Sequence, residues 1–400
     1  MNTDDSILIV EINETNYIFV AGFLNEDNNF QISEKTIVSS YGFSKNKFTN
    51  LDLVKQTVKK NIEIIENKLN CIFKEVTIII DNFYCLPVNV SGYKRLNGSQ
   101  ILKENISFIL NSTKLSITEN EKDKTILHIF NSKSILDGAI VENLPIGLFG
   151  DFYNHELSFF LIKNNDLKNI KQIFYESNIN IKKILIKSFV EGTQLIENNK
   201  KEDTFFILKI NKNSSQINYF EKSSLRYIEN FFFGSNFIYK DVEKVCSLGN
   251  EIVKKFFLTE LSKNINDVNN NEFLEKEYFA DTNYRKITKE LIFDVANSRI
   301  EEILNIMFIK NTNIKFLNKS SIQLITIIED KVIQNILKNY FKTPLIKKTN
   351  LKIEFIDKLN SDTSMITATT LSNYGWKKEA IPITQTKNSI ISKIFKYLFN

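Results

Sequence analysis

Several residue types that mark particular classes of protein are rare in this sequence. Its 400 residues include three cysteines, four prolines and one tryptophan. Cys71, Cys85 and Cys246 lie far apart with no paired spacing, which argues against a disulfide framework and predicts buried thiols in a reducing compartment. No apolar run reaches about 18 residues and no basic segment precedes the first apolar run. We therefore expect neither a membrane-spanning helix nor a signal peptide.

Arginine is also scarce, which bears on nucleic-acid binding. Only four of the 52 basic residues are arginines, and the 47 acidic residues leave a formal net charge of +5. The arginine guanidinium is the preferred bidentate hydrogen-bond donor to phosphates and to guanine. Three of the surplus lysines fall in the last fourteen residues, so the rest of the chain is close to neutral. We expect no nucleic-acid partner.

The histidines and paired carboxylates give little sign of catalysis. His128 and His155 have no Cys or His neighbours at metal-ligand spacing. His128 falls in an apolar segment and is expected to be half-buried with its hydrogen bonds satisfied. Neither histidine accompanies a nucleophile motif, and Glu301 and Glu302 are expected on a solvated helix face. The sequence predicts no catalytic residue and no metal site.

The first 200 residues predict an α/β domain that is interrupted by an insertion. Outside the insertion, a hairpin, helices and buried strands are expected at residues 7–10, 17–24, 51–70, 76–80, 166–176, 183–187 and 190–198. Residues 83–163 hold two of the four prolines and several glycines. They are expected to form a compact α+β unit with four strands and one helix, at residues 85–90, 125–131, 134–141, 156–162 and 99–110.

The second half repeats this order of elements in outline. A three-stranded meander, two helices, a long helix, a buried strand and two further helices are expected at residues 205–210, 216–220, 225–231, 237–247, 249–262, 282–308, 322–328, 331–341 and 365–376. Asp330 is expected to cap the helix that follows it. A strand meander followed by helices, occurring twice, resembles the actin-like nucleotide-binding superfamily. The resemblance implies a two-lobed, actin-like (ribonuclease-H-like) α/β fold.

The predicted parts of the chain are discontinuous in sequence. They are a first lobe at residues 1–82 and 164–200 with the helix at 365–376, an inserted α+β subdomain at 83–163, a second lobe at 201–236 and 310–364, a helical upper subdomain at 237–309, a flexible linker at 377–386 and an amphipathic helix at 387–400.

The last fourteen residues, KNSIISKIFKYLFN, are amphipathic when wound as a helix. At roughly 1.5 Å per residue the helix is about 20 Å long, too short to cross a hydrocarbon core about 30 Å thick. Such a helix suits a membrane surface. The alternative is that its apolar stripe docks on its own domain, but the polar segment before it favours the membrane. The proposed membrane-binding residues are six apolar ones on one face and two lysines on the other: Ile390, Ile391, Ile394, Phe395, Leu398, Phe399, Lys393 and Lys396.

Five segments resemble the bacterial cell-division protein FtsA, an actin-like protein. They are TILHIFNSKSILD at 125–137 with NLP at 143–145, FFFGSNFIYKDV at 231–242, the predicted helix at 282–307, FKTP at 341–344, and the linker with the KIFKYLF ending. The resemblance covers nearly the whole chain in element order. It implies a peripheral protein on the cytoplasmic side of the cell inner membrane, at the division site. Its implied partners are the C-terminal tail of the tubulin-like protein FtsZ, the lipid surface and further copies of itself.

The resemblance also identifies three turns that hold nucleotide phosphates in actin-like folds. Glycines there let backbone N–H groups approach the phosphates. In this sequence all three turns lack glycine at those positions, and branched side chains at 324–328 replace the glycine run of the third. The residues concerned are Glu11, which keeps the family's acid, and Asn13 in the first turn, Lys209 and Asn211 in the second, and Thr326 in the third.

These substitutions predict that nucleotide binding is weak or absent and that hydrolysis is absent. Lys209 and Lys212 could still attract phosphate, so ATP with Mg²⁺ remains open as a cofactor. The two alternative functions are an actin-fold ATPase or kinase, and an actin-like assembly protein of another machine, such as a pilus platform. The glycine-poor turns argue against the first, whereas the terminal helix and the insertion favour a division protein over the second.

Arg299 is the candidate partner-binding residue. The resemblance implies that an arginine at this place on the long helix helps to bind the FtsZ tail. The alternative is an intrahelical ion pair with Glu302, three residues further on.

Overall fold

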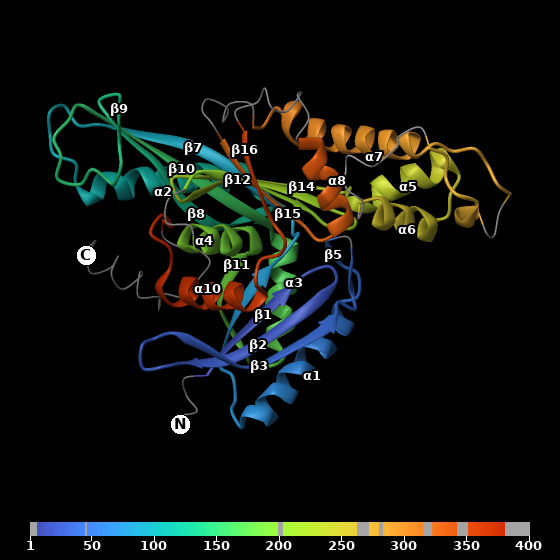
Figure 1. Ribbon diagram of the computed structural model, residues 1–400. Coiled ribbons are helices and arrows are strands. Elements are labelled where there is room, and N and C mark those ends of the chain that lie inside the picture. Colours follow the sequence, from blue (N-terminus) through green and yellow to red (C-terminus); the bar gives the residue numbers. More distant parts are fainter. Residues whose placement is uncertain are drawn as a thin grey trace. The chain divides into compact units, whose positions relative to one another are not determined.

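Figure 1 shows the computed structural model of the chain. It describes residues 6–44, 46–198, 203–261, 272–279, 283–314, 322–341 and 351–380. The chain separates into two compact units. The first comprises Met1–Thr204, Tyr219–Ile228 and Leu359–Asn400, and the second comprises Phe205–Asn218 and Glu229–Lys358.

The first unit is built on a five-stranded sheet in the order β11-β6-β1-β2-β3. Its strands are β1 (Ile7–Ile12), β2 (Asn16–Leu24), β3 (Phe30–Ser39), β6 (Glu75–Ile80) and β11 (Asn180–Ile186). β1 pairs antiparallel with β2 and parallel with β6, which confirms the predicted hairpin and buried strand. Five successive β1 residues, 8–12, are buried, so both faces of the sheet are covered.

Four helices pack on this sheet, and all four are predicted by the sequence. They are α1 (Leu51–Leu69), α3 (Asn164–Tyr175), α4 (Lys187–Asn198) and α10 (Ser361–Tyr374). α1 contacts α3, and α10 contacts α4. The Asn50 side chain caps α1 by accepting a hydrogen bond from the Leu53 backbone N–H at 3.0 Å. A short ribbon precedes α1, formed by β4 (Phe43–Ser44) and β5 (Lys47–Phe48).

The insertion forms a four-stranded sheet in the order β7-β10-β8-β9, covered by one helix. Its elements are β7 (Cys85–Arg95), α2 (Lys103–Asn120), β8 (Lys124–Leu136), β9 (Ala139–Val141) and β10 (Phe152–Lys163). The helix predicted at 99–110 is therefore misplaced. α2 begins later and runs ten residues further, because Thr113 and Ile117 continue its buried stripe.

The predicted boundary between the strands at 125–131 and 134–141 is also wrong. β8 continues through both as far as Leu136, and the chain reverses at Asp137 and Gly138 before β9. Both turn residues have positive φ, 51° and 83°. Two such residues make the tight hairpin turn that matches the twist of the strands.

The second sheet has the order β14-β13-β12-β15-β16. Its strands are β12 (Phe205–Ile210), β13 (Ser215–Glu221), β14 (Ser224–Phe231), β15 (Ile322–Ile328) and β16 (Leu351–Ile356). The tip of the β13–β14 hairpin, Tyr219–Ile228, belongs to the first compact unit. An antiparallel meander followed by two parallel strands repeats the order of the first sheet, so the predicted duplication is confirmed. β3 and β16 complete the two sheets and are absent from the prediction.

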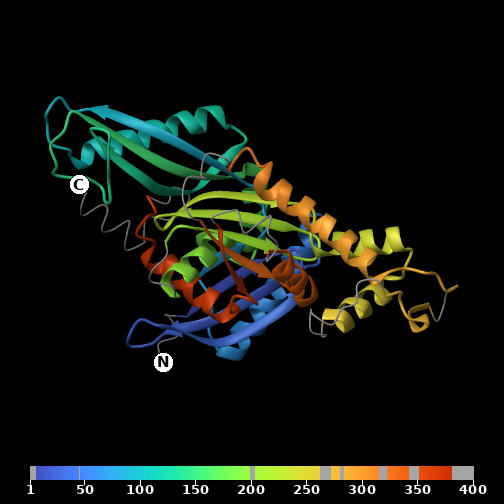
Figure 2. The same cartoon turned by 45° about the horizontal axis from the view of Figure 1, so that its top comes forward.

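The second unit also contains the helices α5 (Ser235–Cys246), α6 (Asn250–Leu261), α7 (Lys289–Leu304) and α8 (Lys331–Phe341), with the short 3₁₀ helix η3 (Lys276–Phe279) and the short π-helix η4 (Asn305–Ile309). Figures 1 and 2 show α5 and α7 side by side. The long helix predicted from residue 282 begins at Lys289 instead, where the Thr288 hydroxyl caps it by accepting from Leu291 N–H. Glu301 and Glu302 are exposed, as predicted.

The C-terminal predictions are only partly covered by the described residues. The predicted helix at residues 387–400 lies outside them, together with its eight proposed membrane-binding side chains. Of the predicted linker, residues 377–380 are described, and 378–380 of these pair with β8 instead of forming a loose connection. Within the described ranges, no helix has both the length and the apolar character that crossing a bilayer requires.

The three cysteines are free and buried, as the sequence predicts. Burial raises the pKa of the Cys85 thiol to about 12. Burial also raises the pKa values of Cys71 and Cys246.

Close packing against a neighbouring aromatic ring leaves no space for a side chain at Gly192 in α4. A Cβ added there would overlap the ring of Phe220, which is fully buried. Alanine normally stabilises a helix interior by about 1 kcal/mol relative to glycine, but overpacking a buried group costs about 1–3 kcal/mol. We expect Gly192→Ala to lower the free energy of unfolding measured with urea. The double variant Gly192→Ala/Phe220→Leu should recover most of the loss, whereas a stabilised single variant would contradict this packing.

Candidate functional site

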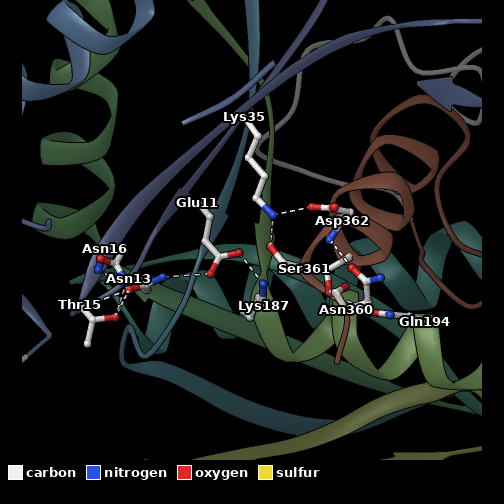
Figure 3. A network of polar contacts seen from close by, with 11 residues as sticks. Glu11, Asn13, Thr15, Asn16, Lys35, Lys187, Gln194, Asn360, Ser361 and Asp362 are labelled. Carbon is white, nitrogen blue, oxygen red and sulfur yellow. Dashed lines mark hydrogen bonds and ion pairs between the residues drawn. The ribbon is translucent and has the colours of Figure 1, made fainter. Parts of the chain in front are cut away.

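The first turn is closed by its own side chain. The Asn13 Oδ1 atom accepts hydrogen bonds from the backbone N–H groups of Thr15 and Asn16, at 3.0 and 2.7 Å. It also accepts from the Thr15 hydroxyl at 3.0 Å. Figure 3 shows this amide folded over the turn. The Asn13 oxygen therefore meets donors that a glycine would leave open to an anion.

The acid of this turn is neutralised by a lysine of the same chain. Glu11 is the next-to-last residue of β1, and its Oε2 atom pairs with the Lys187 ammonium at the start of α4 (Figure 3). Its other oxygen, Oε1, accepts from Asn13 Nδ2 at 3.1 Å. Burial disfavours the charged form of Lys187, but Glu11, Glu191 and Asp81 outweigh it and raise the pKa of the ammonium. The lysine stays protonated and supplies the positive charge at Glu11.

The second turn is present where the sequence places it. Asn211 follows β12, and its backbone N–H donates to the Ser214 carbonyl at 2.9 Å. The carbonyls of Asn211 and Lys212 accept from the backbone N–H groups of Ser235 and Asn236, both at 2.9 Å. The turn therefore satisfies the first donors of α5, which would otherwise attract an anion. Its other predicted residue, Lys209, is 8% exposed.

The third predicted turn is wrong. Residues 324–328 lie within β15, which pairs in parallel with β12 on one side and with β16 on the other. Thr326 is fully buried, and its hydroxyl has no hydrogen-bond partner among the described residues. The chain turns only after Ile328, because branched residues extend a strand where glycines would end it.

The bend after β15 is also capped from within the chain. The Asp330 Oδ1 atom accepts from the backbone N–H groups of Val332 and Ile333 at 3.0 and 3.2 Å, as predicted for this cap. A carboxylate on these donors adds negative charge where phosphates would need positive charge. Taken separately, the described residues of the three segments do not fit a nucleoside triphosphate with Mg²⁺.

Both histidines are buried, and His128 is more buried than predicted. Its ring is 0% exposed, and Nδ1 lies 3.1 Å from Glu379 Oε1. His155 is 1% exposed, and neither ring nitrogen has a hydrogen-bond partner in the described part of the chain. Burial lowers the pKa of His155 to about 4, so it is neutral in the folded protein. The described residues also contain no cluster of three or more His, Cys, Asp or Glu side chains suited to a metal.

Arg299 joins two helices of the second unit. Its Nε atom pairs with Asp241 of α5, and its NH1 nitrogen donates to Glu302 Oε2 of α7 at 2.5 Å. The predicted pair with Glu302 is therefore present. The sequence misses Asp241, which lies 58 residues earlier. The Arg299 side chain remains 28% exposed, and its proposed partner role stays a prediction.

Comparison with known proteins identifies relatives among cell-division proteins. No protein-family model matches the chain. It is 20% identical over 301 residues to the cell division protein FtsA of Buchnera aphidicola from Acyrthosiphon pisum, covering 74% of this chain and 71% of that protein. It is 17% identical over 302 residues to FtsA of Neisseria meningitidis, covering 75% and 72%. A 23% identical match to Protein Ycf2 of Angiopteris evecta covers only 13% of that protein.

A solved structure supports the fold. The chain of a PilM–PilN type IV pilus biogenesis complex matches with a TM-score of 0.54, covering 92% of this chain and 97% of that chain at 8% identity. The chain has the actin-like ATPase fold, as predicted. Together with the curated relatives, this makes it a divergent FtsA-like protein, similar in sequence to proteins of bacterial cell division.

The closed turns predict the response to nucleotide. We expect isothermal titration of the protein with ATP and Mg²⁺ to give no measurable binding. Asn13→Gly should lower the free energy of unfolding by about 1–2 kcal/mol, because it removes the amide that satisfies the turn, and should not create binding. Low-micromolar affinity in the unmodified protein would contradict the assignment, and so would strong binding gained by Asn13→Gly.

Proposed function

We propose that this protein anchors FtsZ filaments to the cytoplasmic side of the cell inner membrane at the division site, without hydrolysing nucleotide. The observation that carries the proposal is similarity to FtsA proteins of two bacterial genera over about three quarters of the chain. The turns support the non-enzymatic part, because Asn13, Lys187 and Asp330 meet charges and donors that a catalytic nucleotide site would direct at its ligand.

Membrane attachment is assigned to residues 387–400 on their sequence. Six large apolar side chains contribute about 1.5–3 kcal/mol each when fully buried, and partial burial with the cost of ordering the helix offsets much of this. One copy should therefore bind reversibly. Self-association would place many copies on one surface and raise the overall affinity by avidity.

Substitutions in the terminal segment test the attachment. Ile394→Asp/Phe395→Asp places two carboxylates on the apolar face, where lipid would have to desolvate them. We expect the variant to stay in the supernatant when vesicles of mixed zwitterionic and anionic lipids are sedimented, whereas the unmodified protein pellets with them.

A matched control separates lipid insertion from simple charge. Ser389→Asp/Asn400→Asp adds the same two charges to the opposite face of the helix. It should lose much less vesicle binding, because only attraction to anionic headgroups is weakened. If Ile394→Asp/Phe395→Asp still pellets with lipid, the segment does not insert as proposed.

The FtsZ tail is proposed to bind near Arg299. An acidic tail would have to share this guanidinium with Asp241 and Glu302, which already hold it. Arg299→Glu removes the positive charge and should weaken binding of a fluorescent FtsZ tail peptide by about tenfold or more, as expected when a charge pair is reversed.

A second variant keeps this test apart from helix packing. Asp241→Asn releases one competitor of the peptide while preserving the shape of the contact between α5 and α7. Peptide affinity should be unchanged or higher in this variant. Equal affinity of Arg299→Glu and the unmodified protein would remove Arg299 from the site.

The runner-up function is assembly of another machine. The structural match to a PilM–PilN pilus biogenesis complex favours it specifically, although a fold alone does not define function. Co-sedimentation with FtsZ filaments in the presence of vesicles distinguishes the two. Recruitment of FtsZ to lipid supports the division anchor, and its failure in a protein that binds lipid favours the alternative.

A further inference from the structure

Residues Trp376–Ala380, which we call the strap, follow α10 and run alongside β8 of the inserted sheet. The Asn131 N–H donates to the Lys378 carbonyl at 2.7 Å, and the Ala380 N–H donates to the Ile129 carbonyl at 2.8 Å. Glu379 stands opposite Phe130 in this antiparallel bridge. The strap therefore adds a short edge strand to β8, which belongs to a different part of the first unit from α10.

A buried ionic contact holds the strap in register. The Glu379 Oε2 atom lies 2.8 Å from Lys183 Nζ, and Oε1 lies 3.1 Å from His128 Nδ1. The Lys183 ammonium also donates to the Leu371 carbonyl of α10 at 2.9 Å. The side chains of Lys183 and Glu379 are each 2% exposed. Losing one partner of such a pair leaves an uncompensated buried charge, which is strongly destabilising.

The strap also contacts the hairpin tip Tyr219–Ile228. The Trp376 indole N–H donates to the Ser223 carbonyl at 2.7 Å, and this bond is buried. The same tip pairs with the inserted sheet, because Arg226 lies 3.3 Å from Glu156 of β10. A few residues of strap thus connect α10, β8, β11 and the hairpin tip.

We propose that the strap is a latch that opens locally when the Lys183–Glu379 contact is broken, and that while closed it fixes the start of the C-terminal tail to β8. The role of the strap in holding the tail rests on the proposed membrane attachment. Tension from a lipid-bound tail would then bear on this contact before reaching α10. The local opening of the strap depends only on contacts within the folded chain.

Hydrogen–deuterium exchange of the full-length protein tests the latch. Glu379→Gln keeps the shape of the side chain but leaves the Lys183 ammonium without its counter-charge. We expect peptides covering residues 376–380 and 129–131 to exchange about tenfold faster or more, because a local opening becomes easier. Peptides covering α1 should be unchanged, and so should every peptide of the control Glu63→Gln, whose side chain is exposed on α1.

A double variant tests whether the contact acts through charge. Lys183→Met/Glu379→Gln removes the stranded ammonium, so residues 376–380 should exchange more slowly than in Glu379→Gln alone. Unchanged exchange in Glu379→Gln would overturn the proposal. Equally accelerated exchange across the whole first unit would also overturn the proposal, because the substitution would then destabilise the entire unit and not open the strap locally.

Vesicle sedimentation separates this inference from the proposed function. Glu379→Gln leaves residues 387–400 intact, so it should pellet with lipid as the unmodified protein does. Loss of lipid binding in this variant would contradict a latch that is distinct from the membrane segment. If the unmodified protein itself fails to bind vesicles, the membrane attachment fails and the exchange result decides the latch independently.

Discussion

The buried ion pair between Glu11 and Lys187 is the contact on which the candidate site of the first unit depends. Glu11 lies near the end of β1, Lys187 begins α4, and Asn13 donates to the same carboxylate, so sheet, turn and helix meet at one point. Breaking a buried pair from one side typically costs about 3–5 kcal/mol. Because the counter-charge comes from the chain, this arrangement needs no bound cation to neutralise Glu11.

This internal neutralisation of the turn is consistent with the proposed role in attachment. An enzyme keeps its donors directed at substrate, whereas here Asn13 and Asp330 already satisfy the donors beside them. The fold leaves the role open, since it is shared with a pilus biogenesis complex. The proposed function therefore rests on the similarity to FtsA proteins, and the geometry of the turns supports the proposal that this chain does without nucleotide.

Sequence periodicity predicts most helices and buried strands because each shows its own apolar pattern. The sequence does not predict β3, because most of its residues are exposed or partly exposed and it has no continuous apolar run. Thr326 is misassigned for another reason: residues 322–328 also predict a strand, and that prediction is correct because branched side chains extend β15 through the expected turn. The contacts of Arg299 with Asp241 and of Lys183 with Glu379 span 58 and 196 residues. A single sequence carries no signal for pairs so distant.

The buried thiols have a practical consequence. Cysteine reacts with maleimides and oxidants as the thiolate, and burial keeps Cys71, Cys85 and Cys246 protonated and covered. A new cysteine introduced on the surface should therefore accept a fluorophore or spin label selectively in the native background. Distance measurements between such probes can test the proposed membrane attachment without first removing the native sulfhydryl groups.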